Sequence, residues 1–267
     1  MNLQSRNPFF SIVVCCWNSI EYVRECVRSV LEQEFTSYEI VFVDGGSNDG
    51  TLEYISAVPA RKTVLRDVRG GIAMAMNAGI AAARGEVIAH LHSDDYYLSP
   101  RVLERVHAVF ASNPELAWMF GRFKNDIDGE IVDPPYPARP YARKTLLRRN
   151  IIPHCATFVK ASVFSDLGPF DTRYRLAMDY DMWLRVAAKY EPVQIDDYLG
   201  AFRRHSGSST SANRLQSFNE DFLARFRHGS VWLWPEFAAR YVYRRKKDLN
   251  ASIFPARSSL GRLFHHD

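Results

Sequence analysis

Two adjacent carboxylates, Asp94 and Asp95, are the residues whose types and spacing point most directly to chemistry. They follow residues 87–91, an apolar run typical of a buried strand. In open α/β sheets, ligands bind beyond the carboxyl ends of the strands, where these acids would lie. Because adjacent acids repel each other, a divalent cation that also binds substrate phosphates is a suitable partner. The alternative is structural: Ser93, Asp94 or Asp95 caps the helix that opens near Pro100.

A third acid, Asp44, ends a second apolar run, residues 38–43, and begins a glycine-rich loop. An acid at a strand end can accept a hydrogen bond from a base N–H or a ribose hydroxyl. The alternative is a plain turn in which Ser47, Asp49 or Thr51 caps the next helix. Neither GxGxxG nor GxxxxGK[ST] occurs in the chain, which argues against a nicotinamide cofactor and against a P-loop NTPase.

Alternating strands and helices would position these acids. Apolar runs predict strands over residues 9–16, 38–43, 62–66 and 84–95, with helices between them, and Asn18-Ser19 as the first cap. Short links between such elements are typical of a parallel sheet in an α/β fold. Further along, the pattern predicts helices over residues 100–112 and 176–190, a hairpin over 116–132 turning at Asp128-Gly129, and strands over 154–159 and 193–202. Two helical stretches are expected after Ser211, and a tail from about residue 251.

Composition excludes several classes of protein. The net charge of +4 is too small to indicate a nucleic-acid partner, although residues 201–267 hold 12 Lys/Arg against 5 Asp/Glu. The four cysteines, Cys15, Cys16, Cys26 and Cys155, lack the spacing of a zinc site or a disulfide framework. No apolar run reaches the length of about 18 residues that a membrane helix needs, and the polar N-terminus does not resemble a signal peptide. We therefore expect a cytoplasmic protein.

An ordered set of motifs resembles the family 2 inverting glycosyltransferases. The resemblance covers residues 9–211 in the family's order and spacing, and each piece alone is weak. Its parts are Ser11–Val14 with Asn18, Glu39–Thr51, Gly70-Gly71, Asn77–Ile80, Ala83–Glu86, Ser93–Asp95, Gly168–Asp171, Met178–Arg185 and Phe202–His205.

The resemblance implies an α/β fold of the GT-A type, in which a mainly parallel sheet is flanked by helices. Residues 1–211 would form the transferase domain, with a nucleotide-binding half at about 9–98 and an acceptor half at about 99–211. Residues 212–267 would form a helical extension and tail. The donor would be a nucleotide-diphosphate sugar, most simply a UDP- or GDP-sugar, with Mn²⁺ or Mg²⁺ as cofactor. The acceptor would be a sugar or a polyprenyl-linked sugar in surface polysaccharide or glycolipid synthesis.

The family's motifs also assign expected roles to single residues. Asp179 matches the general base, although Met178 replaces the acid that usually precedes it, and an acid at a helix N-terminus is also favoured by the helix dipole. The metal ligands would come from Asp94, Asp95 and His205, although His92 replaces the usual first acid of the motif. The expected contacts with the nucleotide-sugar donor are Cys16, Glu21, Asp44, Asn77, Asp94 and Arg203, with Arg204 as the alternative to Arg203 near the diphosphate. The acceptor side would include His154 and Asp171.

The C-terminal segment supports two interpretations. An apolar stripe with Phe222 and Phe226, followed by aromatic residues and the basic run 244–247, could lie on an anionic membrane surface. The alternative, which we favour, is a pair of helices packed on the catalytic domain. Two other functions remain compatible with the sequence. One is an inactive sugar- or lipid-binding module of the same fold, and the other is a sugar-phosphate nucleotidyltransferase, whose glycine-rich start is absent.

Overall fold

The first strand is buried on both faces, and this determines how the helices are arranged around the sheet. In β1 (Phe10–Cys16) every residue is buried. Val13 and Cys15 pack into one apolar cluster, whereas Ile12 and Val14 pack into another. Because successive side chains of a strand point to opposite faces, helices must cover both faces of the sheet around β1.

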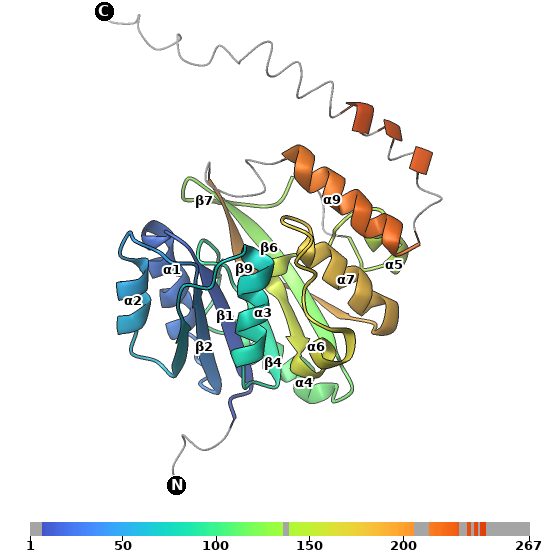
Figure 1. Cartoon of the computed structure of the whole chain (residues 1–267). Coiled ribbons are helices and arrows are strands. Elements are labelled where there is room, and N and C mark those ends of the chain that lie inside the picture. The colour runs from blue at the N-terminus through green and yellow to red at the C-terminus, as the bar shows by residue number, and fades with distance from the viewer. Residues whose placement is uncertain are drawn as a thin grey trace, which may run out of the picture.

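The computed structural model describes residues 7–135, 139–205, 214–229, 234–235, 238–239 and 241–243. In these residues one mixed sheet has the strand order β3-β2-β1-β4-β8-β6-β9-β5, and β7 pairs with β6 (Figure 1). The strands β3, β2, β1 and β4 are parallel, whereas β8 is antiparallel to both β4 and β6. Besides β1, the strands are β2 (Tyr38–Asp44), β3 (Lys62–Leu65), β4 (Val87–His90), β5 (Tyr96–Tyr97), β6 (Trp118–Ile127), β7 (Glu130–Val132), β8 (Thr157–Lys160) and β9 (Val193–Arg204).

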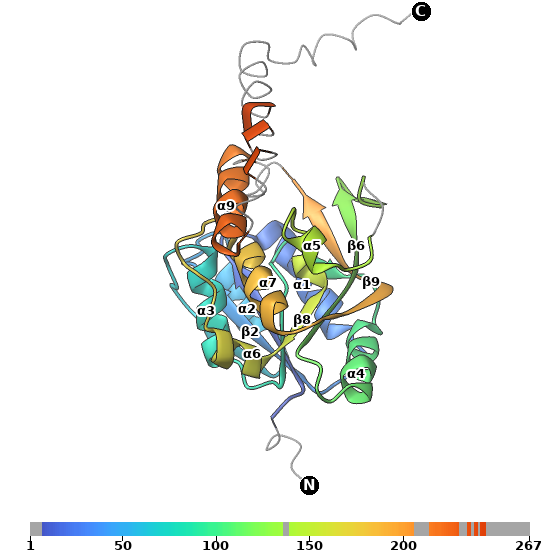
Figure 2. The ribbon, with the colours of Figure 1, turned by 90° about the vertical axis from the view of Figure 1, so that its right-hand side faces the viewer.

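Helices cover the two faces of the sheet. One face packs against α1 (Ile20–Leu31), α2 (Thr51–Ala57) and α4 (Val102–Ser112). The other packs against α3 (Ile72–Ala82), α6 (Ala161–Leu167) and α7 (Met178–Lys189), and Figure 2 shows α3 and α6 opposite α4 across the sheet. Two further helices, α5 (Arg143–Leu146) and α9 (Arg214–Arg227), lie beside α7 (Figure 1). Among the described helices, none is long and apolar enough to span a membrane.

The predicted alternation of strands and helices is confirmed, and so is the hairpin turn. Asp128 and Gly129 have φ values of 53° and 88°, as a type I′ turn requires. The predicted strand 84–95 is too long, because after β4 the chain turns, with the Asp95 N–H donating to the His92 carbonyl. The α9 helix is one of the two helical stretches expected after Ser211. The second expected helical stretch lies largely outside the described residues, and the tail from residue 251 lies entirely outside them.

Three local expectations were wrong or incomplete. Residues His154–Ala156 form a 3₁₀ turn (η2) and only Thr157 begins the strand, while α5 and α6 were not predicted. Ser19 is the N-cap residue of α1 but makes no side-chain cap bond. Instead, Asp49 accepts from the N–H groups of both Ile20 and Thr51, at 3.0 Å each. The glycine-rich loop therefore caps α1 and α2 together, which fixes the end of β2 against the end of β1.

A close backbone approach joins β1 to the start of β4. The Gly85 N–H donates to the Ser11 hydroxyl at 2.8 Å, and that hydroxyl donates to the Glu39 carboxylate at 2.7 Å. A Cβ atom on Gly85 would lie 2.5 Å from the Ser11 nitrogen and 2.6 Å from the Phe10 carbonyl carbon. Only glycine fits here without moving the backbone.

We expect Gly85→Ala to lower the free energy of unfolding by about 1–3 kcal/mol, because a methyl group would be forced against backbone atoms. The measurement is the midpoint of urea unfolding at unchanged slope. Gly45→Ala is the matched control, since its nearest neighbour is the Trp17 side chain at 3.3 Å, which is 70% exposed and can move. Equal midpoints for the two variants would contradict this account of Gly85.

Candidate functional site

The carboxyl ends of β1, β2 and β4 open into a cavity of about 2070 Å³. The strands β2 and β4 pair with β1 on its two opposite sides, so the direction in which strands are added to the sheet reverses at β1. In open α/β sheets, ligands bind in the crevice at such a point. The antiparallel half of the sheet and α7 close the other side of the cavity. The lining includes three predicted donor-site residues, Cys16, Glu21 and Asp94, together with His92, His154, Asp179, Arg204 and His205.

Asp94 and His205 form a pair at one end of this cavity. The Asp94 Oδ2 atom lies 3.0 Å from the His205 Nε2 atom. Their side chains are 26% and 19% exposed, so both atoms are within reach of a ligand. The Tyr22 ring packs against the imidazole of His205, with 4.5 Å between centroids. The structure therefore brings together a carboxylate oxygen and an imidazole nitrogen, two kinds of atom that bind divalent metals.

Asp95 differs from Asp94 although the two are adjacent. It is 1% exposed, and its carboxylate accepts a hydrogen bond from the Arg203 N–H at 3.2 Å. Burial, and then the charge of Asp94, raises the pKa of Asp95 well above its usual range. Within the described residues no group of three or more His, Cys, Asp or Glu side chains is arranged to hold a metal. Of the three predicted metal ligands, the structure thus joins Asp94 with His205 and leaves Asp95 buried beside them.

Arg203 does not line the cavity, whereas Arg204 does. The Arg203 guanidinium forms ion pairs with Glu25 and with Asp126, the latter at 3.0 Å. It also lies over the Tyr96 ring, 5.2 Å from the centroid. Alternation along β9 explains the difference, because neighbouring residues of a strand point to opposite faces. The basic side chain on the cavity side is Arg204.

Three more predicted site residues form hydrogen bonds or ion pairs with other groups of the protein. Asp44 is fully buried, and its carboxylate accepts the Ser47 N–H at 2.9 Å and the Ser47 hydroxyl at 2.5 Å. The Asn77 side chain exchanges two hydrogen bonds with the backbone of Phe170, at 2.9 and 2.8 Å. Asp171 pairs with arginine side chains on its own loop and on α9. None of the three lines the cavity, so they shape its walls.

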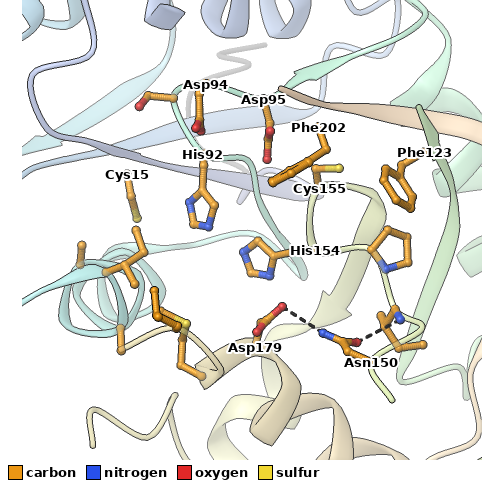
Figure 3. A pocket seen from close by; sticks show the side chains of 18 of the residues that line it. Cys15, His92, Asp94, Asp95, Phe123, Asn150, His154, Cys155, Asp179 and Phe202 are labelled. Carbon is orange, nitrogen blue, oxygen red and sulfur yellow. Dashed lines mark hydrogen bonds between the residues drawn. The ribbon is translucent and has the colours of Figure 1, made fainter. Parts of the chain in front are cut away.

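Asp179 lies at the opposite end of the cavity from Asp94, in the first turn of α7 (Figure 3). One carboxylate oxygen accepts the Tyr180 N–H at 2.7 Å, and the other accepts the Asn150 side-chain N–H at 3.3 Å. Burial raises the pKa of Asp179 to about 6, and these two hydrogen bonds oppose the rise. A carboxylate with this pKa can take up a proton near neutral pH.

Two imidazoles, those of His92 and His154, line the cavity between these two ends (Figure 3). Their rings are stacked at 4.7 Å between centroids, and the buried His90 ring lies 5.6 Å from that of His154. Burial lowers the pKa of all three, to about 3 for His90. The cavity wall between Asp94 and Asp179 therefore contains two neutral imidazoles. One signal of this cluster is present in the sequence, namely the spacing of two that puts His90 and His92 on one side of the predicted strand 84–95.

Asn150 was missed as a site residue, and the resemblance left open whether Arg203 or Arg204 lies near the diphosphate. Asn150 follows α5 in a segment without a recognised motif, and only the fold brings its amide to Asp179. Arg204 has the same type as its neighbour Arg203, so composition could not separate the two. A contact between distant segments places Asn150 in the site, and the side of β9 toward which its side chain points places Arg204 there.

The sequence of the chain is similar to those of known glycosyltransferases. Residues 11–167 match the model of glycosyl transferase family 2. The chain is similar to a hyaluronan synthase of Pasteurella multocida, with 31% identity over 68% of this chain and 19% of that protein. It is also similar to a putative colanic acid biosynthesis glycosyl transferase, WcaA, of Escherichia coli, with 29% identity over 81% of this chain and 80% of that one. The chain thus spans about a fifth of the first relative and most of the second.

Solved structures agree on the fold. The chain resembles Staphylococcus aureus TarS 1–349 in complex with UDP-GlcNAc, with a TM-score of 0.67 and 17% identity over 94% of this chain and 76% of that one. It also resembles the mannosyltransferase PcManGT of Pyrobaculum calidifontis in complex with GDP-Man and Mn²⁺, with a TM-score of 0.62 and 16% identity over 95% and 82% of the two chains. The predicted GT-A fold is confirmed. Because the family model matches more than half of the chain, the protein is a glycosyltransferase that belongs to glycosyl transferase family 2.

Proposed function

We propose that this glycosyltransferase moves a sugar from a nucleoside-diphosphate sugar to an acceptor hydroxyl with inversion at the anomeric carbon. The observation that carries the proposal is the position of Asp179 across the cavity from the Asp94–His205 pair. A single displacement needs a base behind the attacking oxygen and a site for the leaving group on the opposite side of the carbon. The two ends of this cavity supply these two requirements.

Asp179 would act as the general base. The acceptor hydroxyl donates its hydrogen bond to the carboxylate and transfers its proton there as its oxygen attacks the anomeric carbon. The bond from that carbon to the diphosphate oxygen breaks, and its electron pair leaves with the nucleoside diphosphate. A pKa of about 6 suits this role, because the carboxylate is ionised at neutral pH and still basic enough to accept a proton. The hydrogen bond from Asn150 would hold the carboxylate in place.

The Asp94–His205 pair fits a divalent cation, Mn²⁺ or Mg²⁺. Such ions commonly take one or two protein ligands, and substrate phosphates and water complete the coordination. The 3.0 Å separation of the two atoms suits adjacent ligands of one ion. When bound there, the ion would stabilise the charge that develops on the leaving diphosphate. Arg204, which also lines the cavity, would provide a further positive charge for the phosphates.

The donor and acceptor classes rest on the related proteins. Structures of the same fold contain UDP-GlcNAc or GDP-Man with Mn²⁺, which supports a UDP- or GDP-sugar here. The names of the two relatives support a role in polysaccharide synthesis, with a sugar or polyprenyl-linked acceptor. The division into a nucleotide half at 9–98 and an acceptor half at 99–211 accords with Asp94 and Asp179 lying at opposite ends of the cavity. A cytoplasmic location and peripheral membrane contact stay predictions.

Replacement of the base provides the first test. We expect Asp179→Asn to lower kcat for release of UDP from UDP-GlcNAc, or of GDP from GDP-mannose, by about 10²–10⁴-fold, because the amide cannot accept the proton. The Kd of the same nucleotide sugar should stay within about twofold, as measured by calorimetry. Unchanged turnover in the variant would remove Asp179 from the mechanism.

The pH dependence follows from the raised pKa of Asp179. Because the ionised carboxylate is the active form, kcat should rise as pH increases through about 6 and level off above it. The Asn150 N–H stabilises the ionised form, so Asn150→Ala should move the acidic limb of the kcat profile to higher pH. A limb that stays in place, or moves to lower pH, would contradict this role of Asn150.

The metal site can be tested without turnover. We expect Mn²⁺ to increase the Tm shift that UDP or GDP gives, because ligands that bind only the native state stabilise it by RT ln(1 + [L]/Kd). Asp94→Asn should abolish the Mn²⁺-dependent increment, whereas Asp95→Asn, at a buried position beside the pair, should retain it. Equal shifts in Mn²⁺ and in EDTA for the unmodified protein would show that the nucleotide binds without a metal.

A further inference from the structure

The helix α9 holds the segment of chain that leads into the base-carrying helix α7. Glu220, on the inward face of α9, is 9% exposed. Its Oε2 atom accepts hydrogen bonds from the backbone N–H groups of Arg175, Leu176 and Ala177, at 2.9, 2.7 and 3.1 Å. The Gln216 side chain donates to its other oxygen at 2.9 Å, which orients the carboxylate. A single buried carboxylate thus satisfies three consecutive backbone donors.

The position of these donors explains why the carboxylate matters. Ala177 is the N-cap residue of α7 and offers no side-chain oxygen to the first turn. The N-terminal N–H groups of a helix lack partners within the helix, and an anion is stabilised beside them. Glu220 accepts from the N–H groups of the N-cap residue and of the two residues before it, so it holds the chain that enters α7 and places a negative charge beside the helix N-terminus. Asp179 lies only two residues beyond the last bonded N–H.

The held segment also forms part of the cavity wall. Residues 172–176 line the cavity on the side of Asp179. A second contact from α9 supports them, because Arg227 donates to the Tyr174 hydroxyl at 3.2 Å and pairs with Asp171 at 3.3 Å. His228, just beyond the helix, lies 3.2 Å from Asp181 of α7. Polar contacts from α9 thus meet both the wall and the first turn of α7.

We propose that Glu220 is a positioning residue for the transfer step. Through its three backbone hydrogen bonds it fixes the N-terminal turn of α7 and the adjoining wall, and so sets the reach of Asp179 toward the attacking hydroxyl. The Asp94–His205 end of the cavity lies outside these contacts, so binding of the donor diphosphate does not depend on Glu220. This inference rests on the proposed function of Asp179 and adds a residue from beyond the family match at 11–167.

The test compares two substitutions in α9. Glu220→Gln keeps the size of the side chain but replaces the carboxylate, which is the stronger acceptor for backbone N–H groups. Phe218→Leu is the matched control, because Phe218 is a 4% exposed side chain of the same helix and has no hydrogen bond to offer residues 175–177. The kcat values of the two variants are compared under conditions in which both have the same Tm. Urea is added to the more stable variant to lower its Tm to that of the other.

We expect Glu220→Gln to lower kcat for hydrolysis of UDP-GlcNAc or GDP-mannose by about tenfold to a hundredfold, since small displacements of a catalytic group are costly. The Kd of the nucleotide sugar should stay within about twofold, and Phe218→Leu should keep kcat within about twofold of the unmodified protein. Amide hydrogen exchange of residues 175–177 should become faster in Glu220→Gln and not in Phe218→Leu.

Three results would overturn the proposal: unchanged kcat in Glu220→Gln, equal loss of kcat in Phe218→Leu, or unchanged exchange at residues 175–177. Failure of the proposed function gives a different pattern. In that case the unmodified protein neither binds nor hydrolyses either nucleotide sugar, while exchange still reports whether Glu220 holds the turn.

Discussion

Burial of β1 on both faces is the constraint on which the rest of the structure depends. With helices on either side and β2 and β4 as its neighbours, β1 has no edge at which a ligand could bind. The polar groups that follow the parallel strands must therefore leave the sheet at its carboxyl end. This end supplies Asp94 to the cavity, and the antiparallel strands and α7 bring the opposing wall. The polar groups that follow these strands and the residues of the opposing wall therefore meet in this one cavity.

Desolvation then gives the two ends of the crevice different properties. Asp94 remains partly exposed beside His205, whereas burial raises the pKa of Asp179 to about 6. The same burial keeps the imidazoles between them neutral, so these rings add no positive charge that would lower the pKa of Asp179. One physical effect thus produces a basic carboxylate at one end and leaves an accessible carboxylate, the proposed metal ligand, at the other.

The sequence predicted the features that local pattern controls. Apolar runs located the parallel strands, and the acids that follow them, such as Asp94, were found because strand ends are local signals. The sequence did not predict which of Arg203 and Arg204 points into the cavity. The reason is that β9 pairs with β6 through two register shifts that no residue pattern reveals. Glu220 and Asn150 were missed for a related reason. Each acts on a backbone or side chain distant in sequence, and only the folded chain brings these groups together.

The buried contact between α9 and α7 has a consequence for how this protein could be divided. The motifs that resemble the family end just after β9, so a boundary drawn from motifs would fall before α9. A fragment cut there would keep Asp94, Asp179 and His205 but would leave three N–H groups in the segment that leads into α7 without their acceptor. We therefore expect the cooperative folding unit to extend beyond these motifs, and an excised or transplanted domain to need α9.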